Sequence, residues 1–233
     1  MINVYPSESR HYNNHGWLRT HFSFSFSNYY DPDNMGFGPM RVLNDDIVAP
    51  DNGFGMHPHR EMEIVTLILS GQLKHEDSMG NVCISGPGEI QRMSAGTGVY
   101  HSEVNPSSTE EVSLFQMWFE PATYGIEPSY EPFRYDVEAM KNNLLPIVSA
   151  GDKPNTATIN QDMTMYLSEL EAGKEITFTQ EEDRRIFFMV IEGEVTLNGD
   201  TKLGRRDSAR ITEVPTLKIE AAADAKFLLI DLP

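Results

Sequence analysis

Two stretches of the chain decide how its fold is interpreted: GFGMHPH at residues 53–59 and GTGVYHSEVN at residues 96–105. Each holds two potential metal ligands separated by one residue, His57 and His59 in the first and His101 and Glu103 in the second. Residues two apart on a β-strand point to the same face, roughly 6–7 Å from each other. Two such pairs on facing strands would bring three imidazoles and one carboxylate to one point. Such a ligand set suits a divalent transition metal.

The sequence around these stretches has the pattern of short strands separated by turns. Phe22, Phe24 and Phe26 alternate with serines, which predicts a strand that directs its three rings into the core. Strands are also expected at 64–69, 112–119, 164–170, 186–191, 194–197, 209–211, 217–220 and 227–232. Such spacing is typical of an all-β barrel or sandwich.

The strand pattern weakens from Pro121 to about Asn160, a stretch that contains five prolines. We expect residues 131–160 to connect two β-rich halves, with a short helix around residues 137–143. The predicted domains are therefore residues 1–130 and residues 161–233, each a β-barrel.

Net charge excludes one large class of function. The chain carries 35 acidic against 18 basic residues, a formal net charge of −17. Direct binding to DNA or RNA needs a positive surface that displaces counterions from phosphates, so we expect none. The sequence has no run of eighteen apolar residues and no signal-like N-terminus, and its one cysteine is Cys83. We therefore expect no membrane span and a reducing compartment, the cytoplasm.

Histidine is distributed unevenly between the two halves. All seven histidines, at positions 11, 15, 21, 57, 59, 75 and 101, lie in the first half. The second half has neither histidine nor cysteine, so we expect it to be structural and to bind no transition metal.

The histidine pairs alone leave the metal site open, because an isolated His-x-His is about as often two surface imidazoles. Glu63 is a competing carboxylate, but it lies four residues beyond His59, roughly 13 Å along a regular strand. We expect Glu63 to be hydrogen-bonded or solvated instead. For His75 we expect local hydrogen bonds at a strand end. Candidates for lining the pocket are Phe54, Met56, Gln91 and Met93.

The two stretches resemble the paired motifs of cupins, in which histidines lie between glycines and a Gly-x-Gly-x-x-His motif is followed by an asparagine, here Asn105. The similarity narrows to the pirin family, and it extends along essentially the whole first half. The matching segments are residues 16–18, 21–24, 29–32, 35–37, 41–45, 57–59, 75–77, 93–96, 101–103 and the C-terminal 229–233.

This resemblance implies a bicupin, an all-β chain of two cupin barrels with one metal in the first. In pirins the metal ligands are the two histidines of the first motif with the His and Glu of the second, which match His57, His59, His101 and Glu103. Fe(II) is the first expectation for the metal, with Mn, Ni, Cu, Co or Zn as alternatives. Bacterial pirins with these ligands resemble quercetin 2,3-dioxygenases, which open a flavonol ring with O2 and release carbon monoxide. Glu103 is then the expected proton acceptor.

A second class of function is compatible with the same resemblance. Some pirins act as metal-dependent regulators that bind a transcription factor or a metabolic enzyme, and an acidic surface is compatible with protein partners. Metal-dependent turnover of a flavonol would favour the enzyme. Metal binding without turnover, but with capture of a protein partner, would favour the regulator.

Overall fold

The computed structural model describes residues 1–151 and 153–233, and these residues form strands joined by turns. Within them the helices are two short 3-10 turns, η1 at Ser7–Ser9 and η2 at Val137–Met140. The prediction of an all-β chain is confirmed. In the described part of the chain, no helix has the length and apolar character that crossing a membrane requires.

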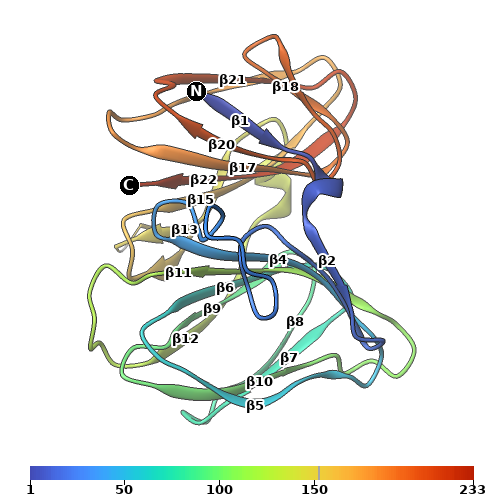
Figure 1. Ribbon diagram of the computed structural model, residues 1–233, viewed down its shortest axis with the longest axis vertical. Coiled ribbons are helices and arrows are strands. Elements are labelled where there is room, and N and C mark those ends of the chain that lie inside the picture. Colours follow the sequence, from blue (N-terminus) through green and yellow to red (C-terminus); the bar gives the residue numbers. More distant parts are fainter. Residues whose placement is uncertain (152) are drawn as a thin grey trace. The chain divides into compact units, whose positions relative to one another are not determined.

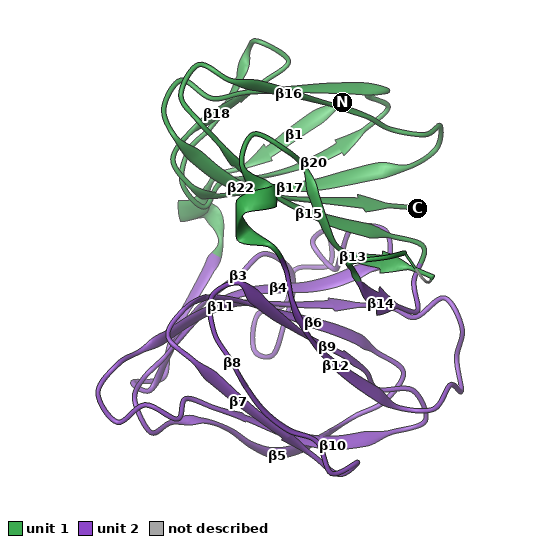
Figure 2. Cartoon of the chain, turned by 180° about the vertical axis from the view of Figure 1, so that it is seen from behind, with its two compact units in different colours: residues 1–10, 136–156, 162–233 green, residues 11–135, 157–161 purple. Residues whose placement is uncertain are grey.

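The chain forms two compact units, coloured separately in Figure 2. The N-terminal unit comprises residues 11–135 and 157–161, and the C-terminal unit comprises residues 1–10, 136–156 and 162–233. The first ten residues belong to the C-terminal unit because Ile2–Tyr5 pairs with strand Ser208–Thr212. This division differs from the boundaries expected from the sequence, since the segment 131–160 is divided between the two units and contributes strands to each.

The N-terminal unit consists of two antiparallel sheets, seen around a common interior in Figure 1. The larger sheet has the order β12-β9-β6-β11-β4-β3-β2. Its strands are β12 Ser129–Arg134, β9 Glu89–Ser94, β6 Glu63–Ser70, β11 Val112–Phe119, β4 Met40–Val48, β3 Leu18–Phe22 and β2 His11–Asn14. The smaller sheet has the order β5-β10-β7-β8, with β5 Gly53–His59, β10 Val99–Val104, β7 Leu73–Asp77 and β8 Val82–Ser85. The short strand β14, Ala157–Ile159, also belongs to this unit.

The C-terminal unit repeats this two-sheet arrangement. One sheet contains, side by side, β1 Ile2–Tyr5, β20 Ser208–Thr212, β17 Arg185–Glu192, β22 Ala225–Leu232, β15 Thr164–Leu170 and β13 Leu145–Ala150. The other has the order β16-β21-β18-β19, with β16 Glu175–Thr179, β21 Thr216–Glu220, β18 Val195–Leu197 and β19 Thr201–Leu203. The turn between β18 and β19 contains Asn198 and Gly199, both at positive φ, as expected for a tight hairpin.

The interiors of the two units differ in chemistry. In the C-terminal unit the paired residues Ile176 and Ile219, and next to them Phe178 and Leu217, contribute to one apolar cluster. In the N-terminal unit the smaller sheet has His57 opposite His101 and His59 opposite Val99. The N-terminal barrel therefore has imidazoles on neighbouring strands of its smaller sheet, whereas the C-terminal barrel has apolar side chains on its smaller sheet.

Most of the predicted strands are confirmed, but the phenylalanine alternation is not one strand. β3 ends at Phe22, and Ser25 then accepts and donates hydrogen bonds within a loop that reaches Asp31. Phe24 is fully buried, as expected of a core residue, whereas Phe22 and Phe26 line a cavity described below. The predicted helix shortens to the single turn of η2, capped by the Asp136 side chain.

Candidate metal centre

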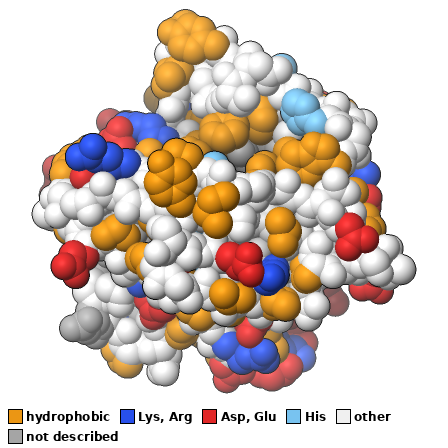
Figure 3. Space-filling model, turned by 90° about the horizontal axis from the view of Figure 1, so that it is seen from below, with side chains coloured by type: hydrophobic (Ala, Val, Ile, Leu, Met, Phe, Trp, Pro, Cys, Tyr) orange, Lys and Arg blue, Asp and Glu red, His pale blue; other side chains and the backbone are white. Residues whose placement is uncertain are grey.

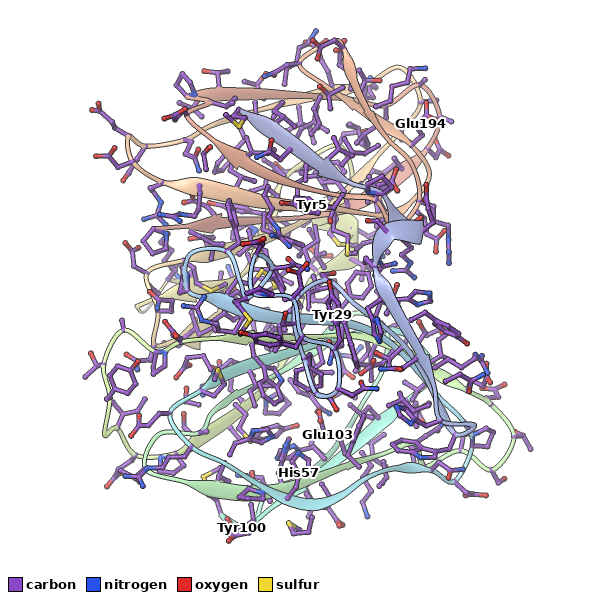
Figure 4. All side chains as sticks on the ribbon, in the orientation of Figure 1. Tyr5, Tyr29, His57, Tyr100, Glu103 and Glu194 are labelled. Atoms are coloured by element: carbon purple, nitrogen blue, oxygen red, sulfur yellow. The ribbon has the colours of Figure 1, made fainter. Side chains whose placement is uncertain are left out.

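Three histidines meet inside the N-terminal unit. The ligand atoms of His57, His59 and His101 all lie within 4.8 Å of one another. β5 supplies the first two and β10 the third, and the two strands pair antiparallel with His101 opposite His57. The alternation of side chains along each strand directs the three rings to one side of the small sheet. In Figure 4 the labelled His57 and Glu103 lie between the two sheets of the unit, whereas Tyr100 projects outward.

The spacing of the ring nitrogens fits a shared cation. Nε2 of His57 lies 3.0 Å from Nε2 of His101. Two nitrogens bound at about 2.1 Å to one ion, at right angles to each other, would lie about 3.0 Å apart. Nδ1 of His57 lies 2.7 Å from the carbonyl oxygen of Gly55, so this nitrogen donates and Nε2 keeps its lone pair. The geometry therefore fits a metal held by Nε2 atoms.

The electrostatics of the cluster also suit a cation. Burial, followed by the charge of His57, lowers the pKa of His59 to about 4. Burial and the neighbouring histidines lower the pKa of His101 to about 2. Both rings are therefore neutral at pH 7, with lone pairs available for a metal ion.

Glu103 lies in the same interior but outside the histidine cluster itself. Its side chain is buried, and both oxygens accept hydrogen bonds, Oε1 from Thr66 at 3.2 Å and Oε2 from Gln116 at 2.6 Å. Trp118 donates to Gln116 in turn and so fixes the orientation of the amide. Burial raises the pKa of the Glu103 carboxyl. Each carboxylate oxygen retains a second lone pair, so ligation by Glu103 is chemically feasible.

A β-bulge sets the direction of Glu103. The pairing of β10 with β5 shifts between His101 and Glu103, so that Glu103 is opposite Phe54 instead of Gly55. Two residues of β5, Gly55 and Met56, thus oppose the single residue Ser102. Bulges of this kind re-aim a side chain beside a functional site.

Two buried polar side chains, His75 and Asp77, form a series of hydrogen bonds that supports His101 on the side away from His57. Nδ1 of His101 lies 3.5 Å from Nδ1 of His75, whose Nε2 lies 2.9 Å from Oδ2 of Asp77. The His75 ring stacks on Tyr130 at 3.9 Å between centroids. When Nε2 of His75 carries the proton and donates to Asp77, Nδ1 of His75 is an acceptor. Nδ1 of His101 can then donate to it, which leaves Nε2 of His101 unprotonated and facing His57. His75 therefore does more than make the local hydrogen bonds predicted from the sequence.

The cluster borders a cavity of about 380 Å³, within the range of roughly 300–1,000 Å³ usual for small-molecule sites. His57, His59 and Glu103 line it together with five aromatic residues, Trp17, Phe22, Phe26, Phe54 and Trp118. Several of these rings meet edge to face, as Phe26 does with Trp118 and Trp17 with Phe54. The face shown in Figure 3 is hollowed, with hydrophobic side chains around the hollow and histidine atoms beside it. Such walls suit a flat aromatic ligand.

The cavity also contains a carboxyl group that sequence reasoning missed. Asp46 on β4 lines the cavity and is 2% exposed. Burial raises its pKa to about 7, assisted by the charges of Asp45 and Glu103. The signal that could have indicated it is the polar run Asn44–Asp46, which interrupts the apolar residues of β4 between Val42–Leu43 and Ile47–Val48.

Other predicted residues have structural roles. Glu63 is buried, and its Oε2 accepts hydrogen bonds from Ser94 and from the backbone of Asn160, so it is hydrogen-bonded as expected. Of the residues proposed to line the pocket, Phe54 does so, while Met56 is 58% exposed. Cys83 is half-buried, and its neighbours on β8, Val82 and Ile84, face solvent. His15, for which the sequence indicated no role, also lines the cavity.

Comparison with known proteins identifies the family. The family described as Pirin matches residues 5–119, and the one described as Quercetinase C-terminal cupin domain matches residues 146–232. A protein of Escherichia coli K12 named quercetin 2,3-dioxygenase is 42% identical over 233 residues, covering 100% of this chain and 99% of the relative. A pirin-like protein of Caulobacter vibrioides is 35% identical over 232 residues, covering 99% of both chains.

Solved structures agree with the sequence comparison. The bacterial pirin YhhW of Escherichia coli, crystallised in complex with nickel(II), superimposes with a TM-score of 0.95 at 41% identity. That superposition covers 100% of this chain and 99% of the other. These relatives agree with the two cupin units and with the histidine cluster of the N-terminal unit. The chain belongs to the pirin family.

Proposed function

We propose that this protein is a metal-dependent dioxygenase that opens the ring of a flavonol such as quercetin with O2 and releases carbon monoxide. The observation that carries the proposal is the meeting of three imidazoles, two of them in the wall of an aromatic-lined cavity that also contains a buried carboxylate. The name of the 42% identical relative from Escherichia coli supports the substrate class. We place this activity in the cytoplasm, the compartment predicted from the sequence.

His57, His59 and His101 would hold the metal, with Glu103 as the proposed fourth ligand. Fe(II) is our first candidate, and Ni(II), the ion bound by the related bacterial pirin, is the main alternative. When bound, such an ion acts as a Lewis acid for a deprotonated hydroxyl and provides an open position for O2.

The side chains of the protein bind the substrate, exclude water and accept the proton. The five aromatic side chains of the cavity hold a flat ligand and exclude water. Glu103 accepts the proton of the flavonol 3-hydroxyl, because burial raises the pKa of its carboxyl and brings its basicity closer to that of the substrate. Thr66 and Gln116 keep the carboxylate oriented while the proton moves.

The proposal is tested by turnover. Protein purified without O2 is reconstituted with Fe(II) or Ni(II), mixed with quercetin, and followed by O2 uptake and by carbon monoxide release. The expected result is metal-dependent consumption of O2 with one carbon monoxide released per flavonol. Stoichiometric metal binding without any flavonol turnover would contradict the proposal and favour a regulatory role.

A further inference from the structure

One wall of the cavity is polar and is built by β4 and its neighbours. Asn44 and Asp46 lie two residues apart on β4, and both line the cavity. Asp46 is opposite Thr20 of β3, and Asn44 is opposite Gln116 of β11. Asp45 lies between them and is absent from the cavity lining, as expected for a side chain on the other face of the strand.

Asp46 and Asn44 each present an unsatisfied acceptor. Oδ1 of Asp46 and Oδ1 of Asn44 are both buried, and neither accepts a hydrogen bond of normal geometry from the residues that the structure describes. The Thr20 hydroxyl opposite Asp46 is buried as well and lies near enough to lower the pKa of the Asp46 carboxyl, but it makes no such bond either. The two residues are 2% and 4% exposed. Native proteins pair nearly all of their buried polar atoms, so two orphaned acceptors on one wall of one cavity require an explanation. A ligand that brings hydrogen-bond donors into this cavity would satisfy them.

The rest of the cavity shows what kind of ligand this is. His57, His59 and Glu103 line it as well, so a molecule in contact with them shares the cavity with the acceptors of β4. The aromatic side chains, Phe26 and Trp118 among them, favour a flat ring system. Both orphaned atoms are oxygens that accept, and ring hydroxyl groups are the donors that a flat aromatic molecule most readily supplies.

We infer that Asp46, together with Asn44, binds a ring hydroxyl of the substrate other than the hydroxyl that is deprotonated for catalysis. This inference rests on the proposed function and narrows its substrate class to polyhydroxylated flavonols. A flavonol whose only hydroxyl is at position 3 leaves the two acceptors unsatisfied and therefore binds less tightly. Asp46 is thus a residue that determines specificity.

The test compares two ligands with and without the Asp46 carboxyl. Protein loaded with Ni(II) is titrated without O2 with quercetin, which has ring hydroxyls beyond position 3, and with 3-hydroxyflavone, which has none. Asp46→Leu should weaken quercetin binding about 10-fold, the scale of one lost hydrogen bond to a buried group, and change 3-hydroxyflavone binding by less than about twofold. Asp46→Asn retains the shape and one neutral acceptor, so it should weaken quercetin selectively but by less.

The matched control is Asp51→Asn, the same carboxylate-to-amide change at an exposed position outside the cavity lining, which should leave both affinities unchanged. If Asp46→Leu does not fold, the selective loss in Asp46→Asn decides the question. Equal weakening of both ligands by the Asp46 variants, or no weakening of either, would overturn the inference and leave the proposed function standing. If wild-type protein binds neither flavonol, the proposed function and this inference are both wrong.

Discussion

The carboxylate of Glu103 is held by two donors, Thr66 and Gln116, in a cavity that it shares with His57 and His59. Glu103→Gln should keep the side chain in place, because a glutamine can orient its oxygen toward the Gln116 amide and its nitrogen toward the Thr66 hydroxyl. Glutamine lacks the charge and the basicity of glutamate. We therefore expect weaker metal binding and, at saturating metal, a turnover of flavonol lowered by about 10²-fold or more.

Raising the pH should restore part of this loss, because the flavonol then arrives already deprotonated. Glu63→Gln is the control, since Glu63 is another buried carboxylate that bonds Ser94 and lies outside the histidine cluster. Steady-state rates of the fully metallated proteins decide the matter. A Glu103→Gln protein as fast as wild type would exclude Glu103 as the base.

His75 supports His101 through its ring nitrogen, and this support should be measurable as metal affinity. His75→Phe keeps the flat ring that stacks on Tyr130 but removes the acceptor for Nδ1 of His101. Residues that orient metal-binding histidines typically contribute 10- to 100-fold to affinity, and we expect a loss of about that size. His11→Phe, which also keeps a stack, on Tyr29, is the control. Competition with a chelator measures the metal affinity of each variant. Equal metal affinities for His75→Phe and His11→Phe would contradict the role of His75.

Asp46 should make the stability of the metal-free protein depend on pH. Its pKa is about 7 in the folded state and 3.8 in the unfolded reference, so between these values the folded state holds a proton that the unfolded state has lost. Stability due to Asp46 is therefore present at low pH and lost as pH rises toward 7, by about 1.4 kcal/mol per pH unit. Asp46→Asn should gain stability relative to wild type between pH 5 and pH 8 in urea unfolding. If the difference in unfolding free energy between the two proteins does not change with pH, the raised pKa of Asp46 is contradicted.

Two paired strands carry the histidine cluster, and this much could be predicted from the sequence. The i, i+2 spacing in residues 57–59 and 101–103 places each pair on one strand face, and the structure pairs β5 with β10 so that His57 is opposite His101. The bulge between His101 and Glu103 could not be predicted, because it depends on how two strands distant in the sequence pair. The same limit applies to β3, where the period of two in phenylalanine continues after the strand has ended.

Gly53 at the start of β5 packs directly against the backbone of β10. A Cβ there would meet the backbone of Glu103 and Val104, whereas a Cβ on Gly55 would meet nothing within 4 Å. Gly53→Ala should therefore push β10 away and lower the free energy of unfolding by about 1–3 kcal/mol, and it should also weaken metal binding. Gly55→Ala is the matched control and should do neither. Equal melting temperatures for the two variants would contradict this account of the strand pair.

At the scale of the whole chain, the two cupin units share an architecture but not a chemistry. The absence of histidine and cysteine after position 101 predicted a C-terminal unit without a transition metal, and the structure places Ile176, Phe178, Leu217 and Ile219 on the paired strands of its smaller sheet. The fold class was readable from strand spacing and motif resemblance. The course of residues 1–10 was not, because the pairing of Ile2–Tyr5 with Ser208–Thr212 joins segments about 200 residues apart, which local patterns do not record.

The central claim is that the histidines of β5 and β10 hold the one metal of the chain, and elemental analysis tests it most directly. Wild-type protein and His101→Ala are purified without O2, reconstituted with Ni(II) or Fe(II), freed of excess ion and measured for metal per chain. The account predicts one ion per wild-type chain and a strongly reduced content in His101→Ala, with unchanged strand content by circular dichroism. Full metal occupancy in His101→Ala, or two tightly bound transition-metal ions per wild-type chain, would contradict it.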